Sequence, residues 1–231
     1  MEKAFAWFVH AYTAAGLLAA AGMAVFIVRG GDDSFRWAFM MMVIATAIDS
    51  TDGWLARKAR VKEVLPDFDG RTLDDLTDFH TYTSMPLLLM WRAEILPGTY
   101  AWALLFALLA SAYGFSRVDA KTPDGFFLGF PSYWNVVAFY LYLLAPPVWV
   151  SLSVVLACAI LTFVPMKYLY MTRGGPFAKV MLITGAVWAA LTAVIILRPA
   201  SERRILALIS LAYPLLYVAL SWVVTAWRKS T

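Results

Sequence analysis

Long apolar runs dominate the chain, and short polar stretches separate them. A membrane-spanning helix needs about 20 mainly apolar residues. By that measure the pattern predicts eight spans, near residues 4–28, 35–56, 73–92, 99–116, 132–148, 150–170, 177–197 and 204–226. Pro146 and Pro147 stand between the fifth and sixth spans, and because a helix rarely continues through adjacent prolines, we expect a tight hairpin there.

The pattern contains no internal repeat and no linker long enough to divide the chain. We therefore expect residues 1–231 to form one domain, an all-α polytopic membrane helix bundle of about eight transmembrane helices. The composition agrees, since 62% of the residues are hydrophobic and 15% are charged, against about 25% charged in soluble domains. The first apolar run has no small-residue cleavage site after a short core, so it is expected to be a spanning helix and not a removed signal.

Basic residues predict which loops face the cytoplasm. With eight spans, the side that holds both termini carries more than twice as many basic residues as the other side, which holds Arg29, Arg36, Arg92, Arg198, Arg203 and Arg204. The richer side holds Lys3, Arg57, Lys58, Arg60, Lys62, Arg71, Arg117, Lys121, Lys167, Arg173, Lys179, Arg228 and Lys229. Cytoplasmic loops are enriched in Lys and Arg, so both termini are expected in the cytoplasm. The net charge of +4 thus reflects topology, and no nucleic-acid partner is predicted.

Four acids interrupt the second and third apolar runs. Asp49 and Asp52 are three residues apart, and Asp74 and Asp78 are four apart, so each pair lies on one face of a helix. An acid in or beside a bilayer is costly and marks a functional site by default. If the cytoplasmic ends of the two helices meet, four carboxylates converge on one point.

Such a cluster predicts a site for two divalent ions. Carboxylates that converge without compensation repel one another, and a bound cation removes that repulsion. Hard oxygen ligands suit Mg²⁺ or Mn²⁺, whereas no cluster of Cys or His suggests zinc. Two such ions can stabilise the attacking and leaving oxygens of a phosphoryl displacement. The sequence therefore predicts cleavage of a nucleotide pyrophosphate.

Neighbouring residues suit a phosphate ligand. Gly53 and Ala56, one and four residues after Asp52, lie on a common helical face and leave room for a ring or a phosphate, and Gly70 opens the next helix in the same way. Arg57 offers a planar fork that matches a phosphate. Asp75 points away from Asp74, so we expect it to cap a helix or to pair with a base from a loop.

These residues resemble the signature of the CDP-alcohol phosphotransferase family. That signature is Asp-x2-Asp-Gly-x2-Ala-Arg, a spacer, then Gly-x3-Asp-x3-Asp, and Asp49, Asp52, Gly53, Ala56, Arg57, Gly70, Asp74 and Asp78 fill it. The spacer of residues 58–69 is longer than in most of the family and is typical of the branch formed by the bacterial phosphatidylcholine synthases. Residues 9–14, 60–66, 126–135 and 137–142 are also similar to that branch, and the resemblance fades beyond Pro147.

The resemblance implies an activity. A member of this branch condenses choline with CDP-diacylglycerol to give phosphatidylcholine and CMP, in the bacterial inner membrane. Two Mn²⁺ or Mg²⁺ ions would be held by the four signature acids, with Asp78 also the general base for the choline hydroxyl. Gly53, Ala56, Arg57 and Gly70 would surround the cytidine diphosphate. The family analogy also implies a homodimer.

Two groups of residues are weaker candidates. His10 and Thr13 lie three residues apart near the cytoplasmic end of the first helix, where they would contact the nucleotide or its phosphates, unless His10 is an ordinary interfacial histidine. A quaternary ammonium is usually held against aromatic faces. Aromatic residues that could hold choline near the acids are Tyr82, Tyr113, Tyr133, Trp134 and Tyr140.

Two other functions stay open. One is a related transferase that uses serine, inositol phosphate or glycerol phosphate; an anionic acceptor would need bases beyond Arg57, and Arg117 and Lys121 keep this alternative open. The other is an acid-lined cation transporter. A transporter is expected to place its acids near the bilayer midplane on broken helices, whereas here they cluster at helix ends beside Arg57 and two glycines.

Overall fold

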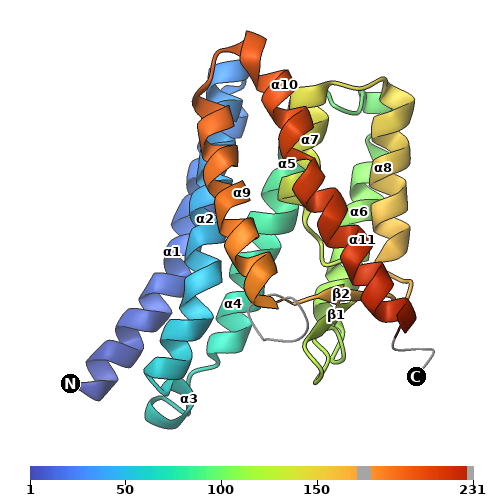
Figure 1. Cartoon of the computed structure of the whole chain (residues 1–231). Helices are drawn as coiled ribbons and strands as arrows, with labels where there is room; N and C mark the ends of the chain where they lie inside the picture. Colours follow the sequence, from blue (N-terminus) through green and yellow to red (C-terminus); the bar gives the residue numbers. More distant parts are fainter. Residues whose placement is uncertain (171–177, 228–231) are drawn as a thin grey trace.

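The chain folds as a helix bundle with one very small sheet. The computed structural model describes residues 1–170 and 178–227, so Arg173, Arg228 and Lys229 of the predicted cytoplasmic side lie outside the described residues. Figure 1 shows the N-terminus, α3, α4, both strands and the last turn of α11 at one end of the bundle. The connections α1–α2, α7–α8 and α9–α10 lie at the opposite end.

Helices α1 (Glu2–Arg29) and α2 (Asp32–Lys58) lie side by side along most of their length (Figure 1). The turn between them consists of Gly30 and Gly31, with φ angles of 71° and 81°. Glycine adopts this region without steric cost, which lets the chain reverse within two residues. The close pairing places the last turns of α2, which carry Asp49 and Asp52, beside the first turns of α1.

A continuous helical segment follows the short helix α3 (Val61–Val64). It consists of α4 (Gly70–Asp78), the π-helical segment η1 (Phe79–Ser84) and α5 (Met85–Arg92). The side chain of Asp69 caps α4 by accepting hydrogen bonds from the backbone N–H groups of Arg71 and Thr72. Pro86 cannot donate a backbone hydrogen bond, and the wider turn of η1 precedes it. Single π-helical turns are frequent at functional sites, and this one begins directly after Asp78.

The main core joins buried residues of α1, α2 and α5 with those of α6 (Trp102–Ser116), α7 (Trp134–Leu144) and α8 (Val148–Leu161). Trp134 is fully buried and donates its indole N–H to Ser111 Oγ over 2.7 Å. The 3₁₀ turn η2 (Gly98–Tyr100) precedes α6. The predicted hairpin at the two prolines is confirmed, because Ala145 adopts φ 42° and Pro147 is the N-cap of α8.

The two-stranded sheet was not expected. Strand β1 (Phe126–Leu128) pairs antiparallel with β2 (Lys167–Leu169), so the predicted helix over 150–170 is wrong at its C-terminal end. Pro165 gives the reason, since proline excludes helix from the residues just before it. Gly129 lies so close to the backbone oxygen of Thr162 that a β-carbon there would clash.

Helices α9 (Ala178–Leu197), α10 (Ala200–Ser210) and α11 (Ala212–Trp227) complete the bundle. The single span predicted over 204–226 is divided at Leu211, because Pro214 removes a backbone donor near this point. At the end far from the acids, the buried Arg203 donates two hydrogen bonds to Asp32, over 3.0 and 2.6 Å. This pair fastens α10 to the start of α2.

The surface of the bundle is apolar. Within the part of the chain that the structure describes, four helical stretches are long and apolar enough to cross a membrane: Glu2–Arg29, Gly98–Ser116, Lys179–Leu197 and Ala200–Val223. Large side chains such as Leu18, Leu109 and Trp149 are at least 69% exposed. Apolar exposure of this extent marks a surface that contacts lipid or a partner. Together with the helix lengths, it identifies a membrane helix bundle.

Candidate functional site

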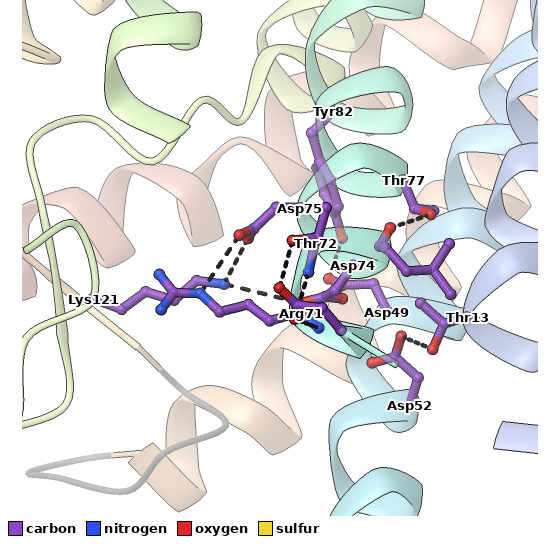
Figure 2. A network of polar contacts seen from close by, with 12 residues as sticks. Thr13, Asp49, Asp52, Arg71, Thr72, Asp74, Asp75, Thr77, Tyr82 and Lys121 are labelled. Carbon is purple, nitrogen blue, oxygen red and sulfur yellow. Dashed lines mark hydrogen bonds and ion pairs between the residues drawn. The ribbon is translucent and has the colours of Figure 1, made fainter. Parts of the chain in front are cut away.

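The signature acids meet where α2 and α4 approach each other. Asp49 and Asp52 come from the last turns of α2, and Asp74 and Asp78 from α4. Figure 2 shows Asp49, Asp52 and Asp74. Asp49, Asp74 and Asp78 each offer a carboxylate oxygen, and these three oxygens lie within 4.8 Å of one another. The three side chains are partly buried, and together they form a set of hard oxygen donors with the chemistry of a divalent-cation site.

Asp52 lies beside this trio and has a partner of its own. Thr13 of α1 donates a hydrogen bond of 2.8 Å to Asp52 Oδ2, and the Asp52 residue is only 6% exposed. The neighbouring Tyr12 and Thr51 share a further hydrogen bond of 2.9 Å between α1 and α2. The sequence predicted four converging carboxylates; the structure brings three to one point and holds the fourth against α1. Thr13 therefore lies beside the acids.

Small residues let α4 come close to α1. The Gly16 backbone lies so near to Thr77 Cγ2 that a β-carbon at position 16 would clash. At position 70, a β-carbon would lie 2.6 Å from His10 Cε1. Glycine is thus required at both positions by a neighbouring protein atom. The contact at Gly70 also explains why His10 lies at this site.

The long spacer rests on α1. Phe68 packs against His10 with ring centroids 4.5 Å apart and against Trp7 at 5.2 Å. His10 is 6% exposed, and its Nε2 atom has no hydrogen-bond partner among the described residues. The spacer therefore encloses His10 and places Gly70 against it.

Gly53, Ala56 and Arg57 follow Asp52 along α2. A β-carbon at Gly53 would make only an ordinary contact, 3.5 Å from a guanidinium nitrogen of Arg57. No close protein neighbour among the described residues therefore requires glycine at position 53. Gly53 and Arg57 are exposed and Ala56 is half-buried, so this face of α2 is open beside the acids.

Asp75 pairs with a base from a loop, which confirms that expectation. Lys121 Nζ lies 3.4 Å from Asp75 Oδ1 and 3.9 Å from Asp74 Oδ2, and Arg71 lies 3.6 Å from Asp75 Oδ2. Burial alone would lower the pKa of Lys121, but Tyr170 and the carboxylates of Asp74 and Asp75 raise it above the ordinary value. Lys121 is therefore a cation at the edge of the acid cluster.

A row of tyrosines leads away from the acids. Tyr82 donates a hydrogen bond of 2.7 Å to Asp49 Oδ2. Its ring centroid is 6.2 Å from that of Tyr133, which in turn lies 5.9 Å from Tyr217 of α11. Tyr217 ends the row by donating to the backbone oxygen of Leu169 over 2.9 Å. Two of the five predicted aromatic candidates, Tyr82 and Tyr133, thus lie beside the acids.

The other three aromatic candidates have different partners. Tyr113 is 45% exposed and packs against Phe163. Trp134 is held in the core by Ser111, and Tyr140 bonds to Ser210 and Trp188. The structure does not bring these three to the acid cluster.

Sequence reasoning missed Tyr217, since it lies in a span that looked purely apolar. A signal was present, because Tyr213, Tyr217, Ser221 and Thr225 recur every four residues and so line one face of α11. Lys121 was considered only as a base for an anionic acceptor. Its distance from the acids in the sequence concealed its contact with Asp74 and Asp75.

Comparison with known proteins identifies close relatives. Residues 10–166 match the family described as CDP-alcohol phosphatidyltransferase. A phosphatidylcholine synthase of Pseudomonas aeruginosa is 36% identical over 207 residues, covering 89% of this chain and 86% of the relative. One from Borreliella burgdorferi is 36% identical over 178 residues, covering 77% and 75%. One from Legionella pneumophila is 39% identical over 171 residues, covering 73% and 66%.

Proposed function

Since the chain belongs to the CDP-alcohol phosphatidyltransferase family, we propose that it is a phosphatidylcholine synthase, which condenses choline with CDP-diacylglycerol to give phosphatidylcholine and CMP. Family membership makes the protein a phosphatidyltransferase, and the names of its relatives, the phosphatidylcholine synthases, indicate choline as the acceptor. The structural observation that carries the choice of choline is the contact between the tyrosine row and the acid cluster at Tyr82 and Asp49.

Choline binds along this row. Only two carbon atoms separate its hydroxyl group from its quaternary ammonium, so when the hydroxyl reaches the acids the ammonium lies within a few atoms of them. The Tyr82 hydroxyl contacts Asp49 and the Tyr133 ring lies against that of Tyr82, so aromatic rings of the kind that attract a quaternary ammonium begin at the acid cluster. Tyr217 extends the same surface.

CDP-diacylglycerol binds beside Asp49, Asp52, Asp74 and Asp78, which would hold the divalent ions. The carboxylate oxygens of these acids fit Mg²⁺ or Mn²⁺, because three of them lie within 4.8 Å of one another and Asp52 lies beside them. When bound, two such ions would offset the charge of the diphosphate and of CMP as it leaves. EDTA should therefore stop turnover, and added Mn²⁺ or Mg²⁺ should restore it; turnover that persists in EDTA would contradict this part of the proposal.

Asp78 is the general base. Its carboxylate accepts the proton of the choline hydroxyl as the choline oxygen bonds to the phosphorus that carries diacylglycerol. The bond from that phosphorus to the CMP oxygen breaks, and CMP leaves with the electron pair. Asp78 is the last residue of α4, directly before the π-helical segment, so its side chain is set by a distinct local geometry.

The nucleotide lies along the open face of α2. Gly53 and Ala56 leave room for it, and Arg57 pairs with its phosphates. Gly70, His10 and Thr13 border the same space from α4 and α1. The unpartnered Nε2 atom of His10 supports this assignment, since a buried polar atom without a partner is costly.

We infer that the single domain crosses the inner membrane of a bacterium eight times. The passes are α1, α2, α4 with α5, α6, α7, α8, α9, and α10 with α11. The arrangement in Figure 1, in which consecutive connections alternate between the two ends, supports this topology. Both termini and the active site, at the ends of the second and third passes, would then face the cytoplasm, where CMP is released.

Other acceptors are disfavoured by charge. An anionic acceptor needs a free basic cluster, but Arg117 is bound to Asp119 by two hydrogen bonds of 2.9 and 2.7 Å. Membership of a phosphatidyltransferase family sets the transporter aside. Purified protein in lipid should incorporate labelled choline into phosphatidylcholine when CDP-diacylglycerol and Mn²⁺ are present. Incorporation of serine, inositol phosphate or glycerol phosphate, with none of choline, would overturn the proposal.

A further inference from the structure

Lys121 reaches the acid cluster from outside the two helices that carry the acids. In Figure 2 its side chain extends to Asp74 and Asp75 from the side opposite Asp52. The Lys121 side chain is 24% exposed, so it stands at the rim of the site and not in the closed core. A ligand that entered the site would meet it.

Once divalent ions occupied the acid cluster, Lys121 would need another anionic partner. Lys121 interacts electrostatically with all four signature acids, Asp49, Asp52, Asp74 and Asp78. Four carboxylates carry as much negative charge as two divalent cations carry positive charge. With both ions bound, Asp74 would no longer serve as a counter-charge for Lys121.

Asp75 does not supply the missing charge alone. It is shared, because Arg71 also pairs with it over 3.6 Å. Lys121 and Arg71 would then share the single carboxylate of Asp75 as their counter-charge, beside bound metal ions. The diphosphate of a nucleotide lipid carries two negative charges and would offset both Lys121 and Arg57 of α2.

There is room for a ligand beside Lys121. A hollow between α4, the end of α6 and the following loop is lined by Arg71, Asp75, Lys121, Phe115, Phe127 and Gly129. Arg117 also borders it but is bound to Asp119. Lys121 thus lies between the acid cluster on one side and an accessible space on the other.

The backbone around Lys121 is held firmly. Residues 120–128, which we name the lysine hairpin, are closed by hydrogen bonds from Thr122 N to Phe126 O, 2.8 Å, and from Leu128 N to Ala120 O, 2.9 Å. Strand β1 of this hairpin pairs with β2. Three side chains of α11 then bind the backbone of β2: Tyr217 and Ser221 contact Leu169, and Thr225 contacts Lys167. These contacts fix the position of the Lys121 backbone.

We propose that Lys121 binds the diphosphate of CDP-diacylglycerol, with Asp75 as the residue that positions its ammonium group. The inference rests on the proposed function for the identity of the donor. It adds a substrate-binding residue outside the signature, and it gives the last helix a part in holding that residue.

Binding of CDP-diacylglycerol without choline tests this assignment, because no acceptor is then present for transfer. Lys121→Met should raise the Kd for short-chain CDP-diacylglycerol in Mn²⁺ by about 10- to 100-fold, the usual effect of losing a hydrogen bond to a charged group. Lys121→Arg should keep the Kd within a few-fold of the wild-type value. The matched control is Lys167→Met, which removes the lysine of β2 that binds Asp124 of the lysine hairpin over 2.6 Å, and should leave the Kd nearly unchanged.

Mn²⁺ affinity, measured by electron paramagnetic resonance, distinguishes diphosphate binding by Lys121 from the competing explanation. If Lys121 served only as a counter-charge for empty acids, Lys121→Met would bind Mn²⁺ more tightly and CDP-diacylglycerol as well as the wild type does; that result would overturn the inference. An equal loss in Lys167→Met would also overturn it. Should Lys121→Met not fold, Lys121→Gln gives the same comparison. A wild-type protein that binds no CDP-diacylglycerol in any divalent ion would instead refute the proposed function.

Discussion

The contact between Gly70 and His10 allows a quantitative test of how the spacer shapes the site. In Gly70→Ala the new β-carbon would lie 2.6 Å from His10 Cε1, whereas carbon atoms in contact prefer about 3.5–4.0 Å. His10 cannot easily yield, because it is buried and packed against Phe68 and Trp7. Overpacking of this kind costs about 1–3 kcal/mol.

A gain in helix propensity opposes this cost. Replacing glycine by alanine stabilises a helix interior by about 0.5–1 kcal/mol, and Gly70 is the first residue of α4. The net effect of Gly70→Ala should therefore lie between about zero and a destabilisation of about 2.5 kcal/mol. For a chain of this size each kcal/mol lowers the midpoint of thermal unfolding by roughly 2–4 °C.

A double-mutant cycle identifies the cause. In a His10→Ala background the clash is absent and only the helix gain remains, so Gly70→Ala should become neutral or slightly stabilising. Thermal midpoints of the four proteins, measured in one detergent at one scan rate, give the coupling. Effects that add within about 0.5 kcal/mol would refute the steric explanation. If stability returns in the double mutant while choline transfer falls well below that of His10→Ala alone, the space at Gly70 is needed by substrate.

Three further outcomes are expected. Asp78→Asn should reduce turnover by about 10²- to 10⁴-fold and leave CDP-diacylglycerol binding largely intact; normal turnover in this variant would exclude Asp78 as the base. Ser221→Ala leaves the Leu169 N–H without its partner, so a destabilisation of about 1–3 kcal/mol should appear in thermal unfolding, and an unchanged midpoint would contradict the support of β2 by α11. The hydrogen bond from Lys167 lowers the pKa of Asp124. The stability that this bond contributes is therefore present above the ordinary aspartate pKa and is lost as the pH falls through the lowered pKa of Asp124. Hydrogen exchange of the lysine hairpin should accelerate only in that acid range, and Asp124→Asn should not show this acceleration.

Sequence reasoning succeeded where the pattern is local. Acids four residues apart on a helix share a face, and Asp74 and Asp78 of α4 accordingly both reach the acid cluster. The turn at Pro146 and Pro147 was predicted for the same reason, because proline acts on its immediate neighbours. Asp75 was correctly expected to meet a base from a loop.

Tertiary contacts limited the rest. Strands of three residues are too short to show a period of two, so β1 and β2 left no readable pattern. Asp52 turned towards Thr13 because α1 packs against α2, which no spacing within the signature reveals. Tyr217 lies against Tyr133 because of the way α11 packs in the bundle, which its sequence does not reveal.

The support of the lysine hairpin by α11 also sets when the enzyme becomes complete during its synthesis. All four signature acids have been translated by Asp78, and Lys121 follows soon after. Yet the backbone of β2 gains its last partner only when Thr225 has been made and α11 has entered the membrane. A nascent chain would therefore carry its acids early but would fix Lys121 beside them only near the end of translation, so that a chain halted before α11 would hold the acids without a firmly placed lysine.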